Sequence, residues 1–194
     1  MREPDAPRRF RDFLDPNWRG RFAINVLGGA PFDVLSLELG ETATLELVRG
    51  LLANQPILKA GTPSVGSAIT TGEAHLGISA CSTAERARRN GEPQAYRFFE
   101  DYLPVLPLFV CVPEMAPHPN MARLFLVWLV TEGAQLIEEL DISATISAPG
   151  SALAKGVEQQ APGVRIIEER SLADVQKTRA MATKLRAIFS GRGI

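Results

Sequence analysis

Three short segments place glycine or small polar residues between an expected strand and an expected helix. Glycines let backbone N–H groups approach a ligand closely, and hydroxyl groups can donate to it or accept from it. The N-terminus of a helix adds free N–H groups and a positive dipole end, which together favour anions. The candidate ligand-binding residues are Gly28, Gly29, Ala30, Thr62, Ser64, Ser79, Cys81 and Ser82.

Each segment also has a purely structural explanation, and the sequence leaves both open. Gly28 and Gly29 can form a tight turn and nothing more. Ser64 can be the N-cap of the helix that follows it.

Catalysis would require Cys81 as a nucleophile with a histidine base. His75 lies six residues earlier on the same expected strand, which places the two side chains roughly 20 Å apart, beyond hydrogen-bond reach. His118 can approach Cys81 only through the fold. The spacing of the two histidines fits no structural zinc site, so we expect no enzyme, no metal and no cofactor. Solvated charge explains the acidic pairs Glu100-Asp101, Glu138-Glu139 and Glu168-Glu169.

The composition is that of an ordinary globular protein. The 194 residues suit one domain or two small lobes, with 45% hydrophobic residues and 21 basic against 22 acidic side chains. This balance disfavours nucleic acid as a partner, and the basic cluster of Arg86, Arg88 and Arg89 is typical of a solvated helix face. Cys81 and Cys111 stand in apolar, strand-like contexts, which favours two buried thiols and leaves a single disulfide open.

Periodicity predicts strands that alternate with helices, the pattern of an α/β protein with a mostly parallel sheet. Strands are expected at residues 21–26, 57–59, 75–80, 94–99 and 105–112. Helices are expected at residues 31–54, 64–71, 83–90, 120–140 and 172–189. Asn120 should cap the fourth helix, which we expect to be an amphipathic core helix, and Ser171 with Asp174 should cap the last. Residues 141–149 should be extended and residues 149–163 loop or weak helix.

Four segments resemble, in order and spacing, the extracellular solute-binding proteins of ABC importers, of the iron- and thiamine-type family. The quoted segments are PRRFRDFLDPNWRGRFAIN, LELVRGLLANQPILKAGTPSVGSAITTGEAHLGIS, LPVLPLFVCVPEMAPHPN and APHPNMARLFLVWLVTEGAQLI. The resemblance implies the second lobe of a type 2 periplasmic-binding-protein fold, plus C-terminal helices. It divides the chain into an arm or crossover (1–20), lobe two (21–98), a remnant of lobe one (99–148) and a loop with a C-terminal helix on lobe two (149–194).

The loop at residues 79–83 departs from the ferric-binding members of that family. Those proteins carry an adjacent tyrosine pair where this chain has Cys81 and Ser82, and Tyr96 and Tyr102 lie outside the motif. Ser82 is neutral at pH 7, and an unactivated cysteine is mostly protonated. We therefore expect a small polar or anionic solute, not iron held by a tyrosine pair.

Family members begin with a secretory signal and a first lobe, whereas here Met1 is followed by charged residues. The expectation is a fragment, a misplaced start or a shortened descendant, periplasmic by resemblance but cytoplasmic if expressed as written. Residues 103–145 would then expose apolar surface, which predicts a homo-oligomer.

The resemblance implies a solute-binding component that hands its small-molecule solute to an ABC permease. The alternative is a vestigial or protein–protein interaction module that self-associates and binds no solute. An effector-sensing domain of a transcriptional regulator would need a helix-turn-helix, and residues 1–20 are too short for one.

Overall fold

The computed structural model describes residues 6–106, 110–134, 136 and 151–191. Two short 3-10 helices, η2 (Phe10–Leu14) and η3 (Pro16–Trp18), lead into the first strand. The strands are β1 (Phe22–Asn25), β2 (Ile57–Lys59), β3 (Leu76–Ile78), β4 (Tyr102–Pro104) and β5 (Arg165–Ile167). The α-helices are α1 (Phe32–Ala53), α2 (Thr62–Thr70), α3 (Cys81–Arg89), α4 (Pro119–Val130), α6 (Ala152–Gln160) and α7 (Leu172–Phe189).

Three strands form a parallel sheet in the order β2-β1-β3. Ala23 of β1 lies opposite Ile57 of β2 on one side and opposite Gly77 of β3 on the other. The chain crosses from β1 to β2 through α1 and from β2 to β3 through α2, as parallel strands require. The α/β class with a parallel sheet flanked by helices is confirmed, and the expected elements between residues 21 and 90 match within two residues.

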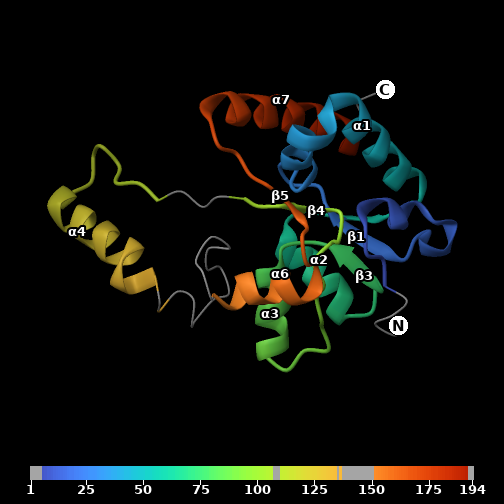
Figure 1. The fold of residues 1–194 in the computed structure, drawn as a ribbon, viewed down its shortest axis with the longest axis horizontal. Coiled ribbons are helices and arrows are strands. Elements are labelled where there is room, and N and C mark those ends of the chain that lie inside the picture. The colour runs from blue at the N-terminus through green and yellow to red at the C-terminus, as the bar shows by residue number, and fades with distance from the viewer. Residues whose placement is uncertain (1–5, 107–109, 135, 137–150, 192–194) are drawn as a thin grey trace.

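Alternate residues of β1 face different helices. Phe22 and Ile24 belong to the larger core, which also contains side chains from η2, α1 and α7. Ala23 belongs to a second cluster with Val65 and Ala68 of α2. In Figure 1, α1 and α7 lie together above the strands, and α2, α3 and α6 lie below them. The sheet is therefore covered on both faces.

Small residues bring α2 close to the sheet and to α3. A Cβ on Gly77 of β3 would lie 2.5 Å from Cγ1 of Val65, and a Cβ on Gly66 of α2 would lie 2.9 Å from Cγ2 of Thr83. Both distances are shorter than a carbon–carbon contact allows. Gly77 therefore lets α2 pack closely on β3, and Gly66 lets α3 pack closely on α2.

A second, two-stranded parallel sheet pairs β4 with β5, and Leu103 lies opposite Ile166. Strands expected at residues 94–99 and 105–112 are absent from the described residues of both ranges. In the first range, buried Gln94 instead donates from its amide to the carbonyl of Gly66, and Phe98 packs beside α6 residue Val157. These side-chain contacts hold residues 94–99 against the helices without a strand partner.

The C-terminal helices have side-chain caps. Ser171 accepts a hydrogen bond at Oγ from the Asp174 N–H (3.1 Å), so the predicted cap of α7 is confirmed. Ser151 caps α6 in the same way, accepting from the Ala154 N–H at 3.0 Å. Residues 141–149, expected to be extended, lie outside the described residues.

The helix expected at residues 120–140 is interrupted at Thr131, with residues 132–134 and 136 again helical, and its environment differs from the prediction. α4 ends at Val130, because Thr131 has non-helical angles (φ −115, ψ −100). His118 occupies the N-cap position, and the Asn120 side chain accepts a bond from Arg123 instead of capping. No residue of α4 is buried, so the interpretation as a core helix is wrong. Figure 1 shows α4 standing apart from the sheets.

Candidate functional site

The three predicted segments meet at one edge of the central sheet. Since β1, β2 and β3 are parallel, their carboxyl ends lie at the same edge. Residues 26–31 follow β1, residues 60–61 follow β2 and residues 79–80 follow β3. This edge is where open α/β sheets bind ligands.

Asn25, the last residue of β1, joins the first two segments. Its side chain is 7% exposed, and its Oδ1 accepts from the N–H groups of Leu27 and Gly61, both at 2.9 Å. Its Nδ2 donates to the Leu27 carbonyl at 3.4 Å. The sequence analysis did not single out Asn25, although a polar residue closing a buried strand is a usable signal. It is the clearest positioning residue of this edge.

The two glycines of the first segment have different surroundings. Gly28 is exposed at φ +89, and a Cβ there would meet nothing within 4 Å. Gly29 is buried at φ +119, and a Cβ there would lie 3.0 Å from Cα of Ala182 in α7. The Gly29 carbonyl accepts from the Phe32 N–H at 2.9 Å, which starts α1. Gly28 therefore presents backbone to solvent, Gly29 serves close packing, and Ala30 beside it is half-buried.

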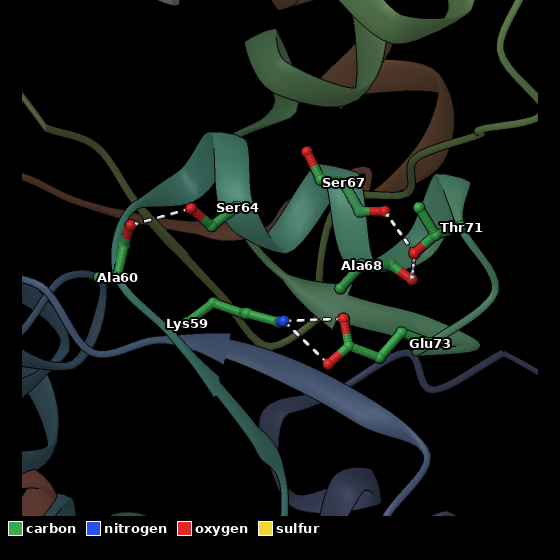
Figure 2. A network of polar contacts seen from close by, with 7 residues as sticks. All are labelled: Lys59, Ala60, Ser64, Ser67, Ala68, Thr71 and Glu73. Carbon is green, nitrogen blue, oxygen red and sulfur yellow. Dashed lines mark hydrogen bonds and ion pairs between the residues drawn. The ribbon is translucent and has the colours of Figure 1, made fainter.

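Hydroxyl groups link the second segment to its neighbours. Ser64 donates from Oγ to the Ala60 carbonyl at 3.1 Å, which Figure 2 shows at the start of α2. The N-cap of α2 is Gly61, so the capping alternative for Ser64 does not hold. Ser79 donates to the carbonyl of Thr62 at 3.4 Å and so connects the third segment to the second.

Cys81 and Ser82 form the first turn of α3. The N-cap, Ala80, has no polar side chain that could accept from the first N–H groups of the helix. Cys81 is half-buried and packs against the cluster that contains Phe98, while Ser82 is half-buried. No disulfide joins Cys81 to Cys111, and Cys111 is exposed, so the prediction of two buried thiols is wrong for Cys111.

Ion pairs stabilise α2 and α3, two of the helices that begin at this edge. Lys59 of β2 reaches under α2 and donates to both carboxylate oxygens of Glu73, at 2.8 and 2.7 Å (Figure 2). Glu85 of α3 is buried and accepts from exposed Arg88 and Arg89. The hydrogen bond from Arg88 holds the pKa of Glu85 below its ordinary value. Arg88 and Arg89, two of the three arginines of the predicted basic face, therefore stabilise α3 itself.

Comparison with known proteins identifies the chain. A family model described as bacterial extracellular solute-binding protein matches residues 2–139, more than half of the sequence. The chain belongs to this family.

This member of the solute-binding family also resembles a solved structure. The crystal structure of iron-bound HitA from Pseudomonas aeruginosa matches with a TM-score of 0.65 at 19% identity. The match covers 97% of this chain and 63% of that one, so this chain spans less than two thirds of the other's length. The likeness confirms the type 2 periplasmic-binding-protein fold. No curated protein matches the chain.

Tyr96 packs against the same apolar cluster as Cys81, whereas Tyr102 packs against the larger core. Tyr96 packs beside Phe98, and Tyr102 lies in β4. Burial, reinforced by Glu85, raises the pKa of Tyr96 and disfavours its phenolate. His75 precedes β3 and Cys81 follows it. Within the described ranges, no three His, Cys, Asp or Glu side chains cluster around a potential metal position, and no helix has the length and apolar character of a membrane span.

Proposed function

We propose that this chain captures a small polar or anionic solute as the solute-binding component of an ABC-type importer. One observation carries the proposal: three loops, and the N-termini of α1, α2 and α3 that follow them, lie at the carboxyl edge of the parallel sheet. The family membership supports a binding role.

The helix ends at this edge favour an oxygen-rich ligand. Gly61 and Ala80, the N-caps of α2 and α3, have no side chain that accepts a hydrogen bond, whereas Ser151 and Ser171 cap α6 and α7. The first N–H groups of α2 and α3 and the positive ends of their dipoles are thus not neutralised by their own caps. An anion or a polar oxygen of the solute can accept hydrogen bonds at such helix N-termini.

The hydroxyl-bearing residues complete the proposed site. Thr62, Ser64 and Ser82 lie in the first turns of the two helices, and all three are half-buried. Ser79 and the backbone of Gly28 lie on the neighbouring loops. These groups donate and accept hydrogen bonds as a neutral polar or anionic solute requires.

Iron held by a tyrosine pair does not fit this donor set. Cys81 and Ser82 stand in the place of the phenolates, and the raised pKa of Tyr96 opposes its recruitment as an anionic ligand. The proposal therefore includes no metal, no cofactor and no catalytic step. By family, the site of action is the periplasm or cell surface, and the macromolecular partner is an ABC permease.

A thermal-shift screen tests the function with oxyanions, carboxylates, sugars, polyamines, thiamine and Fe(III). A solute at a hundred times its Kd adds about 2.7 kcal/mol of stability, which for a chain of this size raises Tm by roughly 5–10 °C. A polar or anionic solute should do so. A response to Fe(III) alone, or to nothing, would contradict the proposal.

A matched pair of substitutions on α2 then locates the site. Ser64→Asp places a negative charge in the first turn and should remove the shift that an anion produces, while stabilising the free protein through the helix dipole. Ser67→Asp adds the same charge to the same helix at an exposed position one turn later (Figure 2) and should preserve the response. Equal loss in both variants would place the solute elsewhere.

A further inference from the structure

The loop that presents Gly28 is held on two sides. On the side of β1, the Leu27 N–H donates to Oδ1 of Asn25 at 2.9 Å. On the other side, buried Gly29 lies against α7, where a Cβ on Gly29 would be 3.0 Å from Cα and 3.2 Å from Cβ of Ala182. Gly28 is exposed between these two contacts. The position of its N–H group therefore depends on both of them.

The contact with α7 leaves no room for a larger residue on either side. Ala182 is buried, and Leu185, on the same side of the helix, has its Cδ1 3.4 Å from the same Cβ position. Packed interiors have few voids, so a displacement of α7 at Ala182 displaces the loop as well. The Gly29 carbonyl accepts from the Phe32 N–H at 2.9 Å, so this contact also sets where α1 begins.

α7 is itself fixed to the rest of the chain on both sides of Ala182. Towards the N-terminus of the helix, buried Thr178 donates from its hydroxyl to the Glu169 carboxylate. Towards the C-terminus, Lys184 forms an ion pair with Glu41 of α1. Figure 1 shows α7 beside α1, above the strands. α7 is thus a firm support for the loop.

We infer that Ala182 is a positioning residue for the solute site, acting through its contact with Gly29. It holds the Gly28 N–H at the carboxyl edge of the sheet, where the solute accepts from it, and has no contact with the solute itself. This inference rests on the proposed function, since it deepens the assignment of Gly28 to the site. α7, at the far end of the sequence, thereby controls the affinity for the solute.

Ala182→Leu tests the inference against two controls on the same helix. The leucine side chain meets the backbone of Gly29, which has no space for it. Ala180→Leu makes the same change at an exposed position. Met181→Ala removes a buried side chain, whereas the atoms nearest to Gly29 belong to Ala182 and Leu185. The second control therefore weakens the packing of α7 without altering the contact with the loop.

Two measurements are made on each variant: the backbone amide chemical shifts of the solute-free protein, and the Kd for inorganic sulfate by calorimetry. Ala182→Leu should move the Gly28 amide resonance and raise the Kd about 10- to 100-fold, which corresponds to one lost hydrogen bond to a charged group. Ala180→Leu should match the wild type in both measurements. Met181→Ala should lower Tm but retain the Kd of the wild type.

Ala182→Gly removes the contact without adding volume, so it tests the same contact even where the leucine variant does not fold. The Phe32 amide should exchange faster in Ala182→Gly than in Met181→Ala, because its acceptor is the Gly29 carbonyl. Equal exchange in these two variants overturns the inference.

The remaining outcomes separate the inference from the proposed function. A Gly28 shift in Ala182→Leu no larger than in Ala180→Leu, or an equal loss of sulfate affinity in Met181→Ala, overturns the inference and leaves the proposed function intact. In a wild type without affinity for sulfate, the proposed binding of oxyanions fails, and the Gly28 and Phe32 amides alone decide the positioning role of Ala182.

Discussion

Replacing Asn25 by alanine should loosen the proposed binding edge and destabilise the whole chain. The side chain is the shared acceptor for the N–H groups of Leu27 and Gly61, which belong to two different loops. Alanine leaves both donors without that acceptor and removes the weaker bond from Nδ2 to the Leu27 carbonyl.

The expected loss follows from where the two donors lie. Leu27 is exposed, so water can replace the acceptor, and the lost bond costs about 0.5–1.5 kcal/mol. Gly61 is only partly exposed, and an unpaired donor there costs about 1–3 kcal/mol. Together the free energy of unfolding should fall by about 2–4 kcal/mol. For 194 residues, this corresponds to a decrease in Tm of roughly 4–16 °C.

Thermal unfolding at pH 7 measures the global effect, and amide hydrogen exchange measures the local one. Exchange at the Gly61 amide should accelerate in Asn25→Ala. The core amides of α1 should exchange faster only to the extent that the global free energy of unfolding falls. Asn25→Asp keeps an acceptor oxygen at the same position and should retain most of the protection at Gly61. If Asn25→Ala keeps the wild-type Tm within about 1 °C and the same exchange at Gly61, the positioning role of Asn25 is refuted.

Two further predictions concern the glycines of the first loop and the acid of α3. Gly29→Ala should destabilise the chain by more than about 2 kcal/mol, because φ is +119 and the new Cβ meets the backbone of Ala182 at 3.0 Å. Gly28→Ala adds only backbone strain and should cost about 1 kcal/mol, so equal denaturation midpoints would refute this reasoning. Since the pKa of Glu85 is lowered, its contribution to stability is present above the ordinary value of 4.5 and is lost as pH falls through the folded value. The wild type should therefore have a larger free energy of unfolding than Glu85→Gln at pH 7, and this difference should disappear in acid. A difference that stays constant with pH would contradict the assignment of this stabilisation to the Glu85 carboxylate.

Local patterns were sufficient to predict most of the central sheet and its helices. The strand at residues 57–59 and the helix at residues 172–189 have the expected bounds, because proline, glycine and the Ser171 cap mark their ends. The meeting of the three loops also follows from sequence, since alternating strands and helices imply parallel strands with one shared carboxyl edge.

Contacts between distant segments account for what the sequence did not reveal. β5 is three residues long with two of them exposed, and only its pairing with β4 makes it a strand. The role of Asn25 depends on Gly61, 36 residues away. The apolar composition of α4 predicted burial, yet the described chain supplies no partner that covers it. Periodicity can indicate that a face must be covered but not what covers it.

The most direct test of the central claim is a titration followed by amide chemical shifts of the wild-type protein, using the solute classes of the thermal-shift screen. We predict that one polar or anionic solute shifts the amides of Gly28, Thr62, Ser64 and Ser82 together. The amides of Arg21 and His75, at the opposite edge of the sheet, should stay in place. Shifts confined to that opposite edge, or no saturable shift with any solute, would contradict the assignment of this edge as a binding site.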